Sequence, residues 1–180
     1  MSARKAMVML GGGPSPVINA SLAGVIERCR DYEAISGLYA AWHGVEGLLK
    51  EELIDLDKQD RQELDLLKAT PASGAIGTCR YKLDAANEED YARIVDVLQA
   101  HEIGFLFCIG GNDTMDTADK VSRLAHARGL DLVVTGVPKT IDNDLGDEGR
   151  TLIDHTPGYG STARYWAMVM QNTEEENRGM

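Results

Sequence analysis

The stretch Ile103-Gly104-Phe105-Leu106-Phe107-Cys108-Ile109-Gly110-Gly111-Asn112-Asp113-Thr114 decides the fold of this chain. Residues 103–109 form a short apolar run, which is typical of a strand that is buried on both faces. Gly110 and Gly111 end this run, and residues 113–128 then have helical spacing up to Gly129. The stretch therefore predicts a strand, a glycine-rich turn and a helix in direct succession.

The same order of elements recurs along the sequence. Residues 6–10 form a second apolar run, which ends at Gly11-Gly12-Gly13 before the helical spacing of residues 17–32. Residues 45–56 have a mixed pattern, helical at first and then alternating like a short strand from residue 53. Further strands are expected at 35–41 and 130–137, and further helices at 60–67, from the cap at Asn87 to His101, and from near Ser161 past Met170.

Strands that alternate with helices, and that are apolar throughout, indicate a parallel sheet covered on both faces. The predicted fold class is therefore α/β, a Rossmann-like three-layer sandwich with a mostly parallel sheet. We expect one domain over residues 1–170 and a polar tail over residues 171–180. In such sheets ligands bind beyond the carboxyl ends of the strands, where both glycine-rich turns lie.

The composition limits the classes of partner. A formal net charge of −11 over 180 residues argues against a nucleic acid or an anionic membrane as partner, since both require a basic face. Residues 1–10 read as a first strand and not as a signal peptide. The three cysteines, Cys29, Cys79 and Cys108, are widely spaced, which favours reduced thiols in a cytoplasmic protein.

Two glycine-rich turns could hold an anion. Glycine lets the backbone approach an oxyanion closely, and the helix that follows each turn adds a favourable dipole. A tight turn alone explains Gly11-Gly12-Gly13-Pro14 equally well, and helix capping by Asn112 or Asp113 explains the second turn. In the functional interpretation, Asn112 and Asp113 would face a magnesium–phosphate ligand.

The segment Pro138-Lys139-Thr140-Ile141-Asp142-Asn143-Asp144 combines a cation with two carboxylates. Lys139 can neutralise phosphate oxygens. Asp142 and Asp144 are two residues apart, so in an extended segment both side chains point to the same side. One carboxylate could then accept a proton from an attacking hydroxyl while the other meets a metal or tunes its neighbour. A solvated acidic turn is the alternative of equal weight.

Arg80 ends a loop of small residues, 71–80, that could bring its guanidinium to the same edge of the sheet. Backbone amides, cations, oxygen ligands for a divalent metal and a candidate base would then meet in one place. This set of groups suits phosphoryl transfer better than any other chemistry the chain could carry.

Together these segments resemble the phosphofructokinase family. Residues 12–20 are similar to its GGxxPGxNA loop, and residues 73–80 are similar to its LGSxR segment. Residues 110–114 resemble its GGDGS or GGDDS segment, and residues 138–144 match its PxTIDND segment directly. The four motifs occur in the family's order and spacing, and the resemblance covers nearly the whole chain. The fold it implies is the phosphoryl-donor-binding domain of that family.

The family uses either ATP or pyrophosphate as donor. ATP users usually carry Gly at the positions of Asp113 and Lys139, whereas pyrophosphate users usually carry Asp and Lys there. Both residues of this chain therefore imply pyrophosphate. A side chain at Asp113 crowds the space that an adenosine α-phosphate needs, and Lys139 adds charge matched to a compact polyanion. An ATP-dependent enzyme and a noncatalytic phosphate-binding module are the alternatives.

The resemblance also implies a role for each site residue. Asp142 would deprotonate the 1-hydroxyl of fructose 6-phosphate, with Asp144 beside it and Thr140 near the transferred group. Gly12 would offer its N–H to phosphate, and Lys139 and Arg80 would stabilise the moving phosphoryl group. Mg²⁺ would bridge the donor oxygens. The implied donor phosphate-binding residues are Gly12, Gly13, Arg80, Gly111, Asp113 and Thr114, and the implied metal ligands are Asn112 and Asp113.

Two residues depart from the family pattern. Asn112 stands where the family usually has a metal-linked Asp, and Val17 stands where it usually has Gly. Family subunits are also about twice as long as this chain or more, by the usual arithmetic of domain size. We therefore expect an incomplete subunit that is not competent alone, and a homo-oligomer for the complete protein.

Overall fold

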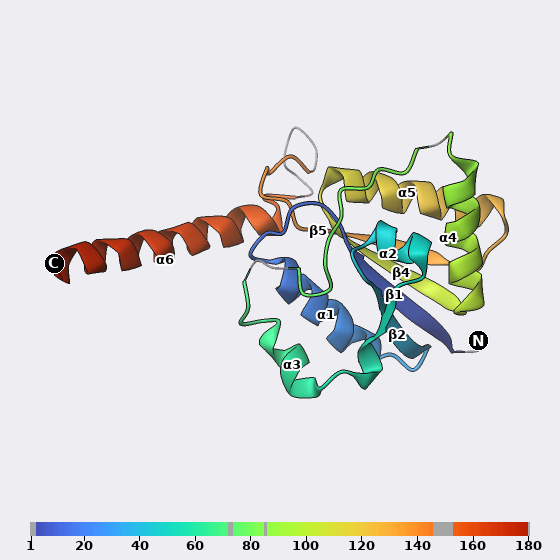
Figure 1. Ribbon diagram of the computed structural model, residues 1–180, viewed down its shortest axis with the longest axis horizontal. Coiled ribbons are helices and arrows are strands. Elements are labelled where there is room, and N and C mark those ends of the chain that lie inside the picture. The colour runs from blue at the N-terminus through green and yellow to red at the C-terminus, as the bar shows by residue number, and fades with distance from the viewer. Residues whose placement is uncertain (1–2, 72–73, 85, 146–152, 180) are drawn as a thin grey trace.

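A five-stranded sheet in the order β3-β2-β1-β4-β5 forms the centre of the protein (Figure 1). The computed structural model describes residues 3–71, 74–84, 86–145 and 153–179. The strands are β1 (Arg4–Leu10), β2 (Ile35–Ala41), β3 (Leu53–Asp55), β4 (Ile103–Gly110) and β5 (Val133–Pro138). The helices are α1 (Ile18–Arg30), α2 (Val45–Lys50), the 3₁₀ turn η1 (Leu56–Lys58), α3 (Arg61–Leu66), α4 (Glu88–Ala100), α5 (Asn112–Ala127) and α6 (Pro157–Gly179).

The sheet is mostly parallel, as predicted. Strand β1 pairs in parallel with β2 on one side and with β4 on the other, and β4 pairs in parallel with β5. The mixed pattern of residues 45–56 resolves into helix α2 and strand β3, which pairs antiparallel with β2. Its antiparallel direction follows from the short connection, since a parallel partner needs a longer crossover.

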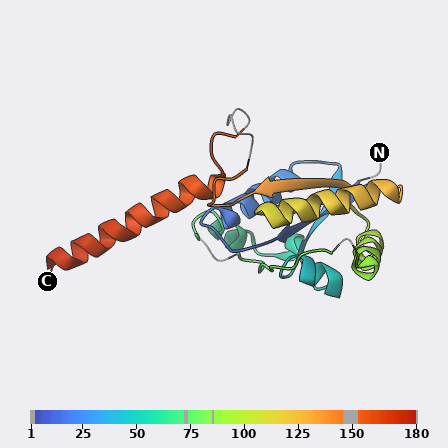
Figure 2. The ribbon, with the colours of Figure 1, turned by 90° about the horizontal axis from the view of Figure 1, so that it is seen from above.

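Side-chain alternation along β1 builds one core on each face of the sheet. Ala6, Val8 and Leu10 pack with the apolar stripe of α1, whereas Met7 and Met9 pack with α2, α4 and α5. Successive side chains of a strand point to opposite faces, so a fully apolar strand must be covered on both. Figure 2 shows the helices above and below the sheet, which confirms the predicted three layers.

Three local predictions need correction. Asn87 occupies the N-cap position of α4 but makes no side-chain capping bond. Strand β5 lies at the edge of the sheet, and Val133 is 50% exposed, so this strand is not buried on both faces. Helix α6 begins at Pro157 and not near Ser161, because proline suits the first turn of a helix.

Helix α6 extends away from the sheet and carries the chain's last described residues (Figure 1). Residues 171–179, expected as a polar tail, continue this helix. The domain boundary at residue 170 stays a prediction. Within the described residues, no helix has the length and apolar character needed to span a bilayer.

Candidate functional site

A cleft of about 460 Å³ opens at the carboxyl ends of β1, β4 and β5. It is lined by Gly12, Gly13, Pro14, Ser15, Arg80, Gly111, Asn112, Asp113, Thr114, Lys139, Thr140, Ile141 and Asp142. These residues include every site residue expected from the sequence except Asp144. The parallel sheet therefore brings four segments together that lie far apart along the chain.

Arg80 reaches the cleft because its segment pairs with the first glycine turn. Gly11 and Cys79 form a parallel bridge, and the Gly12 N–H donates to the Cys79 carbonyl at 2.8 Å. The Arg80 guanidinium comes within 3.0 Å of the place that a Cβ on Gly13 would take. A glycine at position 13 thus leaves room for this cation. Residue 73 of the LGSxR-like segment lies outside the described residues.

The pairing with Cys79 changes the expected role of Gly12. Its N–H is already engaged by the Cys79 carbonyl, so it is not free to bind a phosphate oxygen. Gly12 instead has a φ of +76°, which favours glycine, and lies close to the Lys139 ammonium. Its contribution in this structure is close approach of the backbone and not hydrogen-bond donation.

The second glycine turn packs around Thr114, which is buried. A Cβ on Gly11 or on Gly110 would lie 2.2 Å or 2.1 Å from Thr114 Oγ1, so both positions require glycine for space. Gly111 is the N-cap residue of α5, and no side chain caps this helix end. The capping alternative for Asn112 and Asp113 is therefore wrong.

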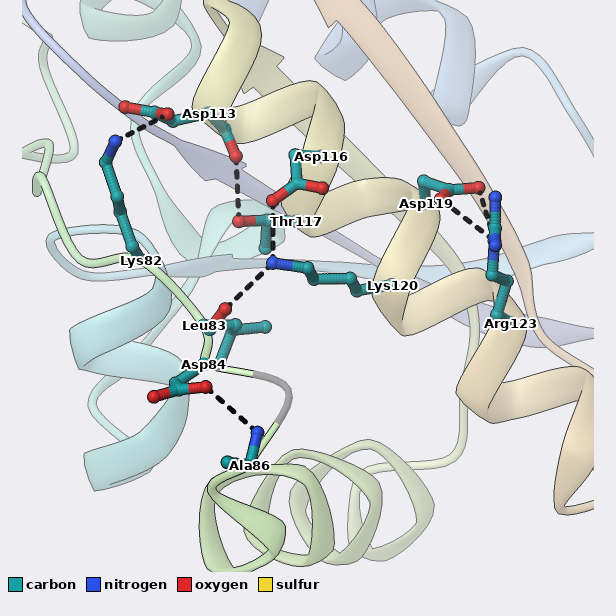
Figure 3. Close-up of polar contacts among 10 residues, drawn as sticks. All are labelled: Lys82, Leu83, Asp84, Ala86, Asp113, Asp116, Thr117, Asp119, Lys120 and Arg123. Atoms are coloured by element: carbon teal, nitrogen blue, oxygen red, sulfur yellow. Dashed lines mark hydrogen bonds and ion pairs between the residues drawn. The ribbon is translucent and has the colours of Figure 1, made fainter.

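Asn112 and Asp113 instead contact side chains from two other segments. Asn112 donates from Nδ2 to Asp144 Oδ2 at 2.6 Å. Asp113 forms an ion pair of 3.0 Å with the Lys82 ammonium (Figure 3). Sequence reasoning missed Lys82, because a single lysine two residues after Arg80 has no motif of its own.

Lys139 is the buried cation of the cleft, and its residue is only 6% exposed. Its ammonium donates to the carbonyl oxygen of Gly13. Burial is the main cause that lowers the pKa of Lys139, the nearby Arg80 adds to the lowering, and Asp142 opposes it. An anion that enters the cleft is therefore bound favourably, because it offsets both the desolvation of this ammonium and its repulsion by a second cation.

Local hydrogen bonds shape the 138–144 segment around Asp142. Thr140 Oγ1 donates to Asp142 Oδ2 at 3.1 Å and accepts from the Asp142 N–H at 3.1 Å. Asn143 has a φ of 56°, so the segment is not extended, and the alternation expected for an extended segment does not apply to it. Asp142 lines the cleft, and Asp144 contacts Asn112, which lines the cleft as well.

Three residues that carry no sequence signal hold this segment in place. Ser15 Oγ donates to the Lys139 carbonyl at 2.8 Å, and Thr156 Oγ1 donates to the Thr140 carbonyl at 2.6 Å. The Thr156 N–H donates to Asn143 Oδ1 at 3.0 Å. A Cβ on Gly158 would lie 1.9 Å from the Lys139 carbonyl oxygen, so the start of α6 packs directly on the cleft loop.

The oxygen ligands in the cleft suit a magnesium ion that is held chiefly by phosphate. In the described part of the chain, no group of three or more His, Cys, Asp or Glu side chains is placed to bind a metal. Asn112, Asp113 and Asp142 supply oxygen atoms at the cleft. Mg²⁺ usually takes one or two protein carboxylates and completes its shell with water and substrate phosphates, so these residues fit it.

The cleft and its motifs agree with the comparison to known proteins. A family model described as phosphofructokinase matches residues 5–180. The chain belongs to the phosphofructokinase family. The resemblance seen in the four motifs is thereby confirmed.

Two relatives of this phosphofructokinase chain are named for pyrophosphate. The pyrophosphate–fructose 6-phosphate 1-phosphotransferase of Methylococcus capsulatus is 41% identical over 183 residues, covering 100% of this chain and 42% of that protein. The crystal structure of pyrophosphate-dependent phosphofructokinase from Nitrosospira multiformis has a TM-score of 0.84 and 39% identity, covering 97% of this chain and 42% of that one. This chain spans about 42% of the length of both relatives.

A more distant phosphofructokinase shares the fold. The Pichia pastoris phosphofructokinase in the T-state has a TM-score of 0.71 and 22% identity, covering 88% of this chain and 17% of that one. The α/β sandwich is therefore common to relatives that differ widely in sequence.

Proposed function

We propose that the complete protein transfers a phosphoryl group from pyrophosphate to the 1-hydroxyl of fructose 6-phosphate, which gives fructose 1,6-bisphosphate and phosphate. The observation that carries this proposal is the cleft that holds Lys139, Arg80, Asp113 and Asp142 together. Both relatives described above are named for pyrophosphate. The described residues of this chain supply the donor side of such a site.

Asp142 is the proposed general base. Its carboxylate would accept the proton of the sugar 1-hydroxyl as that oxygen forms a bond to the transferred phosphorus. The bond from that phosphorus to the bridging oxygen of pyrophosphate breaks, and phosphate leaves. The Thr140 hydroxyl donates to Asp142 Oδ2, which orients the carboxylate and leaves Oδ1 for the sugar.

Lys139 and Arg80 are the proposed charge stabilisers. Both lie at the cleft, and the burial that lowers the pKa of Lys139 also strengthens its attraction for a phosphate oxygen. Asn112 and Asp113 would hold Mg²⁺, which when bound neutralises charge on the donor phosphates. Among the described residues, Asp144 accepts from Asn112 at the cleft, so its proposed part is to orient that amide.

The donor is proposed to be pyrophosphate and not ATP. Both Asp113 and Lys139 line the cleft, and the Asp113 side chain would crowd the space that an adenosine α-phosphate needs. Lys139 contributes a point charge that suits a small polyanion. These two side chains support the choice of donor within a family that uses both.

Substitution of Asp142 tests the proposal in the complete subunit. Asp142→Asn should lower turnover about 100- to 10,000-fold, the usual share of a general base, and should leave magnesium pyrophosphate binding within about twofold. Asp31→Asn is the matched control, because Asp31 is an exposed carboxylate on a surface ion pair. Unchanged turnover in Asp142→Asn would contradict the assignment of Asp142 as the base. Binding of magnesium pyrophosphate without any turnover in the unsubstituted complete subunit would favour a binding module.

The complete protein is also proposed to be a cytoplasmic homo-oligomer. Helix α6 exposes large apolar side chains, among them Trp166 at 57% and Met170 at 69% exposure. Exposed apolar surface of this kind is typical of an interface. Light scattering of the complete protein tests this, and a monomer at micromolar concentration would contradict it.

A further inference from the structure

Lys82 reaches across the edge of the cleft to the first turn of α5. Its ammonium lies 3.0 Å from Asp113 Oδ1, and the two side chains are 72% and 67% exposed (Figure 3). An ion pair this exposed contributes little to the stability of the fold. Asp113 nevertheless lines the cleft, so whatever holds its carboxylate also shapes the site that receives the donor.

The residues on both sides of Lys82 are fixed. Tyr81 donates from its hydroxyl to Asp90 of α4. Leu83 is 2% exposed in the core, and its carbonyl accepts from the Lys120 ammonium at 2.9 Å. Lys120 also pairs with Asp116 at 2.7 Å, so α5 holds this segment about two helical turns after Asp113 (Figure 3). The backbone of Lys82 is thus anchored between α4 and α5.

A small hollow adjoins the cleft between residues 79–81 and α5. Its volume is about 30 Å³, which is the space of about one water molecule. It is lined by Cys79 and Tyr81 from the segment of Lys82, and by Asp113 and Thr117 from α5. It shares Gly12, Arg80, Asp113 and Thr114 with the cleft. A donor group larger than a phosphate could extend here only if α5 and residues 79–82 were less tightly joined.

We propose that Lys82 is a donor-selecting residue, which acts by holding the Asp113 carboxylate in place between residues 79–82 and α5. This inference rests on the proposed function and adds a residue to it. The ammonium does two things for a compact polyanionic donor. It pairs with Oδ1 of Asp113 and leaves Oδ2 for the magnesium that accompanies the donor, and it keeps that side chain where it limits the room beside the phosphates.

The test is a double-mutant cycle of Lys82→Ala and Asp113→Ala in the complete subunit, with magnesium pyrophosphate and magnesium ATP titrated separately by calorimetry. In the unsubstituted subunit we expect tighter binding of magnesium pyrophosphate. Lys82→Ala should lower the ratio of the ATP Kd to the pyrophosphate Kd by about twofold to fivefold, the scale of one exposed charge. In the Asp113→Ala background the same substitution should change that ratio by less than about twofold, because the pair is already lost.

Lys58→Ala is the matched control. Lys58 also forms an exposed ion pair, with Asp55 at 2.9 Å, and it does not line the cleft. The same loss of one positive charge should there leave both Kd values within about twofold.

The outcomes separate this inference from the proposed function. Preference of the unsubstituted subunit for magnesium ATP, or binding of neither donor, overturns the proposed function and this inference with it. Preference for pyrophosphate that is unchanged in Lys82→Ala overturns the inference alone. An equal loss of affinity for both donors on Lys82→Ala, in both backgrounds, also overturns the inference. Lys82 would then attract anions without selecting among them.

Discussion

Ser15 and Lys139 are joined by a buried hydrogen bond, in which Ser15 Oγ donates to the Lys139 carbonyl oxygen at 2.8 Å. The two residues are 2% and 6% exposed and lie 124 positions apart in the chain. The bond ties the loop after β1 to the loop after β5 at the base of the cleft. The spacing between the first glycine turn and the buried ammonium therefore depends on it.

Removal of this hydroxyl should cost measurable stability. Ser15→Ala leaves the Lys139 carbonyl without that donor in a buried place, so the free energy of unfolding should fall by about 1–3 kcal/mol. Urea denaturation of this chain measures the change. Ser36→Ala is the control, since Ser36 is exposed and its loss should stay within about 0.5 kcal/mol. An equal effect of both substitutions would show that the bond contributes nothing specific.

The close packing of Gly11 on Thr114 leads to a second prediction. Gly11→Ala places a Cβ 2.2 Å from Thr114 Oγ1, so the free energy of unfolding should fall by about 1–3 kcal/mol or more. Thr114→Ala should recover much of that loss in the double variant, because it removes the clashing oxygen. Thermal unfolding of the three variants measures this.

Substitution of Gly24 is the control, because it should change the free energy of unfolding in the opposite direction. A Cβ on Gly24 meets no atom within 4 Å inside α1. Gly24→Ala should therefore stabilise the chain by about 0.5–1 kcal/mol through helix propensity. Stabilisation by Gly11→Ala, or no recovery in the double variant, would refute the packing argument.

The lowered pKa of Lys139 predicts a dependence of stability on pH. Between this pKa in the folded state and the ordinary value of 10.5, the unfolded chain binds more protons at this site than the folded chain. The contribution of Lys139 to the free energy of unfolding should thus become more favourable as pH rises through this window. Denaturation of the unsubstituted chain and Lys139→Met, compared across alkaline pH, measures the difference.

The contribution of Lys58 to the free energy of unfolding should change with pH in the opposite direction. The hydrogen bond from Lys58 to Asp55 raises the pKa of this lysine above 10.5. Its contribution is present below 10.5 and is lost as pH rises through the folded pKa. A slope of the same sign for Lys139→Met and Lys58→Met would contradict the pKa shift inferred from burial.

The sequence was sufficient to predict where the site forms. Apolar runs that end in glycine or proline identify parallel strands, and the carboxyl ends of such strands meet at one edge. Lys139, Asp113 and Asp142 consequently lie in one cleft, as their motifs indicated. Strand β1 is apolar on both faces, which likewise requires helices on both sides of the sheet.

The details that sequence reasoning missed depend on contacts between distant residues. Asn143 adopts a positive φ and accepts from the Thr156 N–H, so residues 142–144 are not extended. The Gly12 N–H is taken by a carbonyl 67 positions later, at Cys79. Neither contact leaves a pattern in the local sequence, because each depends on how separate loops meet above the sheet.

The central claim is that this chain forms a donor site selective for pyrophosphate. Calorimetric titration of the 180-residue chain with magnesium pyrophosphate, and with magnesium ATP under the same conditions, tests it most directly. We expect saturable binding of pyrophosphate and markedly weaker binding of ATP. Binding of ATP with equal or higher affinity, or binding of neither donor, would contradict it.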